Sequence, residues 1–127
     1  MNYLLDTHTL IWLLEESPKL SMRAKKLLVD RRNNIYVCSV SLWEIAIKVN
    51  LGKLKLRFTL EELLGRVQNS AIKLLQIEDE YLKKLSALPP IHKDPFDRLM
   101  IAAALVENFT IMTADSNIQK YVVPWVW

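Results

Sequence analysis

The stretch that decides the fold is DPFDRLMIAAALVENFTIMTAD, residues 94–115, in which a helical pattern leads directly into a strand pattern. Asp94 suits the N-cap of a helix, and Pro95 suits its first position. Apolar residues then recur at helical spacing, and Asn108 is expected to end the helix. The β-branched and apolar residues Thr110–Thr113 predict a strand. A helix that leads into a strand is part of a strand–helix–strand unit, the building block of parallel sheets.

The same alternation extends over the rest of the chain. Ser21, Ser41 and Thr59 suit the N-caps of further helices, and Gly52 suits the end of the helix that Ser41 begins. Strands are predicted at residues 3–5, 35–38, 72–77 and 110–113, with an edge strand at 122–127. Alternating strands and helices over 127 residues predict one domain, residues 1–127, built as an α/β sandwich with a parallel sheet.

Composition narrows the possible functions. The chain has 17 basic and 14 acidic residues, a net charge of +3, and one cysteine, Cys38, in an apolar run. A single cysteine forms no internal disulfide, and the N-terminus has neither a basic leader nor a cleavable apolar segment. We therefore expect a cytoplasmic protein without a membrane anchor. The two glycines, Gly52 and Gly65, exclude a glycine-rich phosphate loop, and the absence of a Gly-x-Ser-x-Gly sequence argues against a serine hydrolase.

Four acidic residues fall near the ends of the predicted strands. Asp6 ends the first strand, Glu44 is expected in the first turn of the helix after the second strand, and Asp115 follows the fourth strand. Ligands of parallel sheets bind beyond the carboxyl ends of the strands. Asp97 lies in the first turn of the helix that precedes the fourth strand, so strand order alone does not place it at that edge.

Each of these acids also has a purely structural interpretation. Glu44 follows Ser41 by three residues and fits a capping box, and Asp97 suits the positive end of a helix dipole. Asp6 and Asp115 suit turns. The structural interpretation is weaker for all four together, because clustered carboxylates repel one another and need cations to offset the repulsion.

A cluster of oxygen ligands suits Mg²⁺ or Mn²⁺. Zinc is disfavoured, because Cys38, His8 and His92 have no spacing typical of a zinc site. We expect both histidines to be structural or hydrogen-bonding residues. A metal held by carboxylates can activate water and stabilise the charge on a phosphate, so the acids predict a nuclease.

Together these residues resemble the PIN domain family and, within it, the VapC-type toxins of prokaryotic toxin–antitoxin pairs. The resemblance covers essentially the whole chain and rests on four stretches in order: LLDTH (4–8), SVSLWEI (39–45), HKDPFDRLMIAAA (92–104) and TAD (113–115). It implies a three-layer α/β/α fold with a parallel sheet. It also implies endoribonuclease activity that requires Mg²⁺ or Mn²⁺.

The resemblance implies roles for individual residues as well. The catalytic and metal-binding acids of the family are matched by Asp6, Glu44, Asp97 and Asp115. Asp6 and Asp97 are the expected direct ligands, while the other two complete the metal surroundings or position the water. Thr113 matches a supporting hydrogen-bonding position, and Arg98 is a candidate contact to phosphate or carboxylate. The expected partners are an RNA substrate, a cognate antitoxin and a second copy in a homodimer.

Other interpretations remain open for the sequence alone. A phosphatase of the haloacid-dehalogenase type would use Asp6 as nucleophile and needs an acid two residues later, where His8 stands. The main alternative is a non-catalytic module that binds RNA or a protein partner. The four tryptophans, Trp12, Trp43, Trp125 and Trp127, could stack on bases, although Trp43 is expected in the core. Lys48, four residues after Glu44, suits either a phosphate contact or an ion pair with that glutamate.

Overall fold

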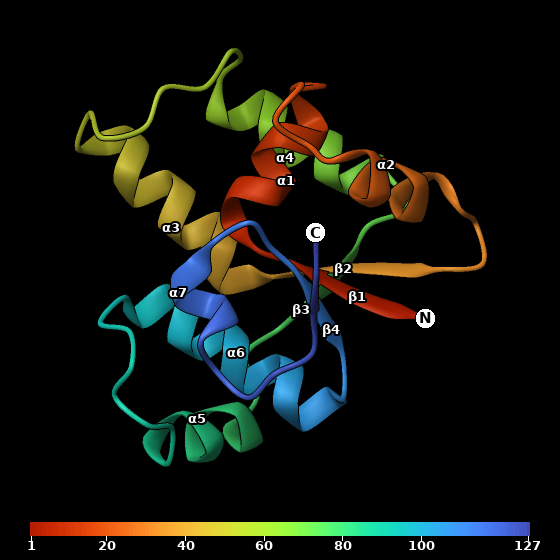
Figure 1. Cartoon of the computed structure of the whole chain (residues 1–127). Coiled ribbons are helices and arrows are strands. Elements are labelled where there is room, and N and C mark those ends of the chain that lie inside the picture. The colour runs from red at the N-terminus through yellow and green to blue at the C-terminus, as the bar shows by residue number, and fades with distance from the viewer.

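The computed structural model describes all of residues 1–127 and contains five strands and seven helices (Figure 1). The elements in chain order are β1 (Asn2–Leu5), α1 (Thr7–Leu14), α2 (Met22–Val29), β2 (Asn34–Cys38), α3 (Ser39–Asn50), α4 (Leu60–Gln68), β3 (Lys73–Leu75), α5 (Asp79–Ser86), α6 (Pro95–Glu107), β4 (Thr110–Met112), α7 (Ser116–Gln119) and β5 (Trp125–Val126). None of the helices combines the length and apolar character needed to span a membrane.

The five strands form one parallel sheet in the order β3-β2-β1-β4-β5. β1 is central, and its Leu5 pairs with Val37 of β2 on one side and with Met112 of β4 on the other. The chain first builds outward from β1 to β3 and then returns to add β4 and β5 on the opposite side. The carboxyl ends of β1 and β4 therefore flank the point where the strand order reverses, which is where α/β sheets commonly bind ligands.

Two cores lie on opposite faces of the sheet, because successive side chains of a strand point to opposite faces. Leu5, Val37 and Met112 are fully buried in the core that α1, α2, α3 and α4 cover. Leu4 and Ile111 are fully buried in the other core, with α5, α6 and α7. Figure 1 shows α1, α2 and α4 on one side of the sheet and α5, α6 and α7 on the other. The predicted three-layer α/β/α sandwich is confirmed.

α6 begins and ends as the sequence predicts. The Asp94 side chain accepts hydrogen bonds from the backbone N–H groups of Phe96 and Asp97, and Pro95 occupies the first helical position. Asn108 ends the helix in the left-handed conformation, with φ of 58°. This φ is tolerated by asparagine better than by most residues, so a common C-terminal signal holds here.

α1 and α3 begin close behind β1 and β2, and the start of α3 differs from the prediction. α1 begins at Thr7, because the side chain of Asp6 serves as its N-cap. α3 begins at Ser39, directly after β2, and Ser41 lies buried in its first turn. The predicted Ser41 cap is therefore wrong, and Glu44 lies in the second turn of α3 instead of the first. Glu44 is therefore not a capping-box residue.

Two other details depart from the sequence-based prediction. The short helix α7 was not expected. Trp43 was expected in the core, yet 60% of its surface is exposed. Its ring meets the ring of Phe96 edge-on, with centroids 5.5 Å apart. Helical spacing does not distinguish a buried position of α3 from an exposed one such as Trp43. The reason is that α3 contacts α1, α4 and α6 and leaves only part of its circumference exposed.

Candidate active site

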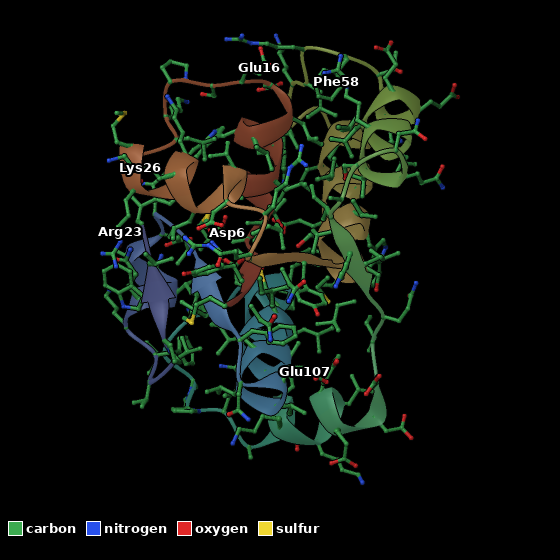
Figure 2. The ribbon with its side chains drawn as sticks, turned by 90° about the vertical axis from the view of Figure 1, so that its right-hand side faces the viewer. Asp6, Glu16, Arg23, Lys26, Phe58 and Glu107 are labelled. Carbon is green, nitrogen blue, oxygen red and sulfur yellow. The ribbon has the colours of Figure 1, made fainter.

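Asp6 directly follows β1 and is buried near the centre of the molecule, with 4% of its surface exposed (Figure 2). Its Oδ1 accepts a hydrogen bond from the backbone N–H of Thr9 at 2.8 Å. Its Oδ2 accepts a hydrogen bond from the hydroxyl of Thr113, which follows the neighbouring strand β4. The carboxylate is therefore fixed between two elements at the carboxyl edge of the sheet.

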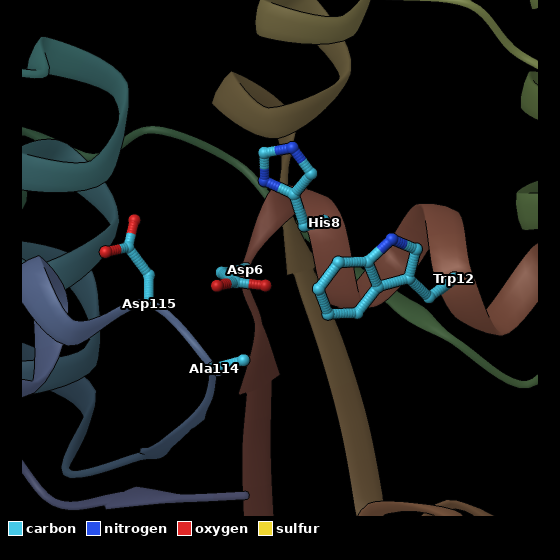
Figure 3. A pocket seen from close by; sticks show the side chains of 5 residues that line it. All are labelled: Asp6, His8, Trp12, Ala114 and Asp115. Atoms are coloured by element: carbon cyan, nitrogen blue, oxygen red, sulfur yellow. The ribbon is translucent and has the colours of Figure 1, made fainter. Parts of the chain in front are cut away.

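Thr113 connects Asp6 to Asp115. Its fully buried hydroxyl donates to Asp6 and accepts a hydrogen bond from the backbone N–H of Asp115 at 2.9 Å. The side chain of Asp115 then caps α7. A cavity of about 250 Å³ opens at this point, lined by Asp6, His8, Trp12, Ala114 and Asp115 (Figure 3).

Glu44 is buried in α3, with 2% of its surface exposed. Its Oε1 accepts a hydrogen bond from the hydroxyl of Thr7 at 2.6 Å. Its Oε2 forms an ion pair with Lys48, one helical turn further along. Of the two roles open to Lys48, the structure contains the ion pair. Both oxygens of Glu44 are thus held in place, one of them from the first turn of α1.

Asp97 lies in the first turn of α6, with 13% of its side chain exposed. Its backbone N–H donates to Asp94 Oδ1 at 3.0 Å, and its Oδ2 lies 2.9 Å from His92 Nε2. His92 was expected to be a structural or hydrogen-bonding residue, and this contact fits that expectation. The four intervening residues include a helix start, so spacing alone gives no signal for the pairing.

The other acids of the site influence the protonation of Asp97. Burial and the charges of Asp94, Glu44 and Asp6 together raise the pKa of Asp97 to about 7, although the hydrogen bond with His92 opposes them. Burial also raises the pKa of Asp6, although hydrogen bonds from Thr113 and Thr9 counteract it. The negative charges of Asp6 and Glu44 therefore disfavour ionisation of Asp97.

Lys48 adds a positive charge to the carboxylate cluster. Burial lowers its pKa, but the hydrogen bond and charge of Glu44 outweigh burial and leave the pKa raised. Asp94 and Asp97 act on Lys48 in the same direction. One lysine among several carboxylates leaves the cluster with excess negative charge.

The topology explains how Asp97 reaches this edge. α6 leads from the carboxyl edge back to the start of β4, because a helix that connects parallel strands must run antiparallel to them. Its N-terminus therefore lies beside the end of β1, and α6 packs against α3, which carries Glu44. In the sequence, only the family resemblance places Asp97 at this edge, although the direction of the crossover helix is sufficient.

Arg98 has a different environment from the expected phosphate or carboxylate contact. Its guanidinium donates to the backbone oxygens of Pro89 and His92 at 2.9 and 3.4 Å and to the Tyr121 hydroxyl at 3.0 Å. The Tyr121 hydroxyl also accepts a hydrogen bond from the backbone N–H of His92 at 2.9 Å. Arg98 and Tyr121 therefore hold the loop that presents His92 to Asp97.

The donor set fits a divalent cation. Asp6 and Glu44 act on Asp97 through their charges, and His92, Asp94 and Asp97 form the group whose ligand atoms lie within 4.8 Å of one another, a group that Asp6, Glu44 and Asp115 do not join. Within it, Asp94 is engaged as the cap of α6. Oxygen donors with a single imidazole suit Mg²⁺ or Mn²⁺ better than a structural zinc site. The raised pKa values of Asp6 and Asp97 reflect burial of negative charge that a cation would offset.

Comparison with known proteins identifies the fold. The family model of the PIN domain matches residues 3–123. The chain is similar to one in the solved structure of VapBC2 from Rickettsia felis bound to a DNA fragment from the promoter, with a TM-score of 0.74 and 18% identity over 99% of this chain and 98% of that chain. It is also similar to a chain of a toxin–antitoxin complex from Klebsiella pneumoniae, with a TM-score of 0.66 and 17% identity over 98% and 96% of the two chains.

A third similar chain comes from VapBC-1 of nontypeable Haemophilus influenzae, with a TM-score of 0.66 and 16% identity over 99% of this chain and 97% of that chain. No curated protein matches the sequence. At identities this low, the similarity to these solved structures establishes a shared fold alone. The family model spans nearly the whole chain, and the chain therefore belongs to the PIN domain family.

Proposed function

We propose that this PIN domain, residues 1–127, is a metal-dependent endoribonuclease that hydrolyses RNA phosphodiesters as the toxin of a type II toxin–antitoxin system. The observation that carries the proposal is that the buried carboxylates of Asp6 and Glu44 act on that of Asp97, beside the point where the strand order reverses. Asp115 lines the adjoining cavity. The one cysteine, Cys38, is fully buried in the core, so no thiol competes as nucleophile.

In this proposal, Asp6 and Asp97 hold Mg²⁺ or Mn²⁺ directly, while Glu44 and Asp115 complete its surroundings or position the attacking water. The cation would supply a more acidic water and offset the charge of the phosphate. The protein fixes the carboxylates in advance: Thr113 orients Asp6, and other side chains hold Glu44 and Asp97. Groups already fixed in position lose little freedom when substrate binds, which favours catalysis.

The test is cleavage of RNA by the purified protein with and without metal. We expect EDTA to abolish cleavage and added Mg²⁺ or Mn²⁺ to restore it. Asp6→Asn is the matched control, because it keeps the shape of the side chain and removes its charge. Cleavage that persists in EDTA or in this variant contradicts the proposal. Binding of RNA without cleavage in either metal would favour the non-catalytic binding module.

We further propose an antitoxin partner whose C-terminal segment covers an apolar groove beside the site. The solved structures from Rickettsia felis and Klebsiella pneumoniae are described as VapBC2 and a toxin–antitoxin complex. The apolar groove of about 410 Å³ whose lining includes Leu13, Leu14, Leu28, Ile35 and Ile72 lies toward the start of β2, where Ile35 pairs with Tyr3, and so does not adjoin the carboxylates. The position of the antitoxin segment therefore rests on the family resemblance. Co-expression of the neighbouring gene product should relieve toxicity, and failure to form any complex contradicts this part. A homodimer is proposed from the family resemblance.

A further inference from the structure

We propose that the cavity between α1 and the loop from β4 to α7 is a nucleobase subsite, in which a base beside the cleaved phosphodiester stacks on Trp12 and contacts His8. The inference rests on the proposed function, because it takes RNA as the substrate. It assigns a ligand to the part of the cavity that the carboxylates do not line.

The cavity has two chemically different sides. Asp6 lies at the end of β1 and Asp115 lies on the loop before α7, whereas His8 and Trp12 project from α1 (Figure 3). The two aromatic residues are four positions apart and therefore share one face of the helix. A phosphodiester beside the carboxylates would bring its attached nucleoside alongside these rings.

Trp12 is held firmly enough to act as a platform. Its ring meets the ring of Trp127 edge-on, with centroids 5.6 Å apart and planes at 61°. The Lys19 ammonium lies 5.7 Å from the Trp12 centroid. The residue is partly buried against the core of the α1 side, yet it still lines the cavity. A fixed aromatic surface can stack any of the four bases, because each base has a π-face.

His8 offers the polar contact that a base or its phosphate needs. Its ring lies 5.8 Å from that of Trp12 at a tilt of 44°, and the residue is exposed. The imidazole makes no hydrogen bond within the protein, in contrast to His92, which contacts Asp97. An imidazole can donate or accept through its two ring nitrogens, so His8 suits a base edge or a phosphate oxygen.

The first experiment tests the subsite without catalysis. Proton–nitrogen NMR resolves the indole N–H groups of the four tryptophans, and the signal missing from Trp12→Leu identifies Trp12. Each of the four nucleoside 5′-monophosphates is titrated into wild-type protein with Mg²⁺. We expect a saturable shift of the Trp12 signal and no comparable shift at Trp43. Trp43 is the internal control, because it is 60% exposed and lines no cavity. No shift at Trp12, or equal shifts at both residues, overturns the proposal.

The second experiment uses RNA whose cleavage site has been mapped, together with copies that lack the base on one or the other side of that site. Removing the stacked base should lower kcat/KM about 5- to 150-fold, the range of one base–aromatic contact. Trp12→Leu should cause a similar loss on intact RNA and little further loss on the abasic copy. Trp12→Phe, which keeps an aromatic ring, should retain most of the wild-type rate.

The matched control is Trp125→Leu, because Trp125 is 45% exposed on β5 and lies outside the cavity. We expect its cleavage of intact RNA to equal that of the wild type. If Trp12→Leu loses the same factor on intact and abasic RNA, the residue has only a structural role and the subsite is refuted. If the wild-type protein cuts no RNA in any metal, the proposed function fails, while the NMR titration still decides the subsite independently.

Discussion

Asp6 and Asp97 each combine a local structural role with a place in the carboxylate cluster. Asp6 caps α1 through one oxygen and meets Thr113 through the other, and Asp97 occupies the first turn of α6 while contacting His92. The structural and cluster interpretations, which are alternatives in the sequence, therefore coexist in these side chains, although Asp6 caps a helix where the sequence indicates a turn. Their energies have opposite signs: the helix dipole favours an ionised acid, whereas burial among other carboxylates disfavours it.

The variant Asp97→Asn measures which effect is larger. We expect RNA cleavage to be lost and the metal-free free energy of unfolding at pH 8 to rise, by on the order of 1 kcal/mol. The raised pKa of Asp97 makes its ionised form costly at this pH, and the lost dipole interaction offsets only about 0.3–1 kcal/mol. Urea denaturation in EDTA and a nuclease assay on the same preparations would measure both quantities.

Asp94→Ala provides the contrast three residues earlier. Asp94 caps α6 with two hydrogen bonds, so its loss should cost about 0.5–2 kcal/mol and spare most of the cleavage. Ser21→Ala removes the cap of α2 and serves as a matched control. If Asp97→Asn destabilises the protein as Asp94→Ala does and still cuts RNA, the assignment of Asp97 to the site is wrong.

Among the elements, the loop between α5 and α6 sets the position of His92. Arg98 reaches back from α6 to the Pro89 and His92 carbonyls, and Tyr121 accepts hydrogen bonds from both Arg98 and His92. The loop has no regular structure of its own between Ala87 and Asp94. These side chains fix it at the end that faces the carboxylate cluster, so they act on Asp97 through His92.

Tyr121→Phe tests this arrangement. The variant leaves two donors without their acceptor, and we expect it to lower the free energy of unfolding by about 1–3 kcal/mol. Because His92 also loosens, affinity for Mn²⁺, measured by calorimetry, should fall together with cleavage. Tyr81→Phe is the control, since it removes a hydrogen bond to Glu107 at 2.7 Å, near the opposite end of α6. It should cost similar stability and leave Mn²⁺ affinity unchanged. Equal Mn²⁺ affinity in both variants would contradict the role of the loop.

The sequence predicts elements well where the signals are local. Asp94, Pro95 and Asn108 mark both ends of α6, because caps and the left-handed conformation depend on adjacent residues only. The Ser41 prediction fails because β2 leads into α3 without a loop, so the helix begins before any capping side chain. The contact between His92 and Asp97 depends on a loop held by Tyr121, almost thirty residues away in sequence, and no local pattern carries that information.

Across the whole molecule, the strand order creates the site. β1 and β4 are neighbours although most of the chain separates them, and their ends bring Asp6 beside Thr113. Alternating strands and helices predict the parallel sheet and place Asp6, Glu44 and Asp115 at its carboxyl edge. They do not predict which strands are neighbours, since the order depends on the faces that the crossover helices cover. The packing of two buried cores must therefore hold the carboxylates together against their repulsion.

This repulsion makes the stability of the metal-free protein depend on pH in a direction that can be stated. The pKa of Asp97 is raised from 3.8 to about 7, so between these values the folded protein binds more protons than the unfolded chain. Its stabilising contribution is complete below about pH 4 and is lost as the pH rises through 7. Asp6, whose pKa burial also raises, acts in the same direction.

We therefore expect the free energy of unfolding in EDTA to fall between pH 4.5 and 7.5, and Asp97→Asn to flatten this slope. Mg²⁺ or Mn²⁺ at about 100 times its Kd should add about 2.7 kcal/mol at the upper end, because it binds the folded state. Asp30→Asn is the matched control: the hydrogen bond from Arg32 lowers the pKa of Asp30 to about 2, below the window, so the slope should not change. A slope that survives in Asp97→Asn, together with no stabilisation by either metal, would mean that these carboxylates form no cation site.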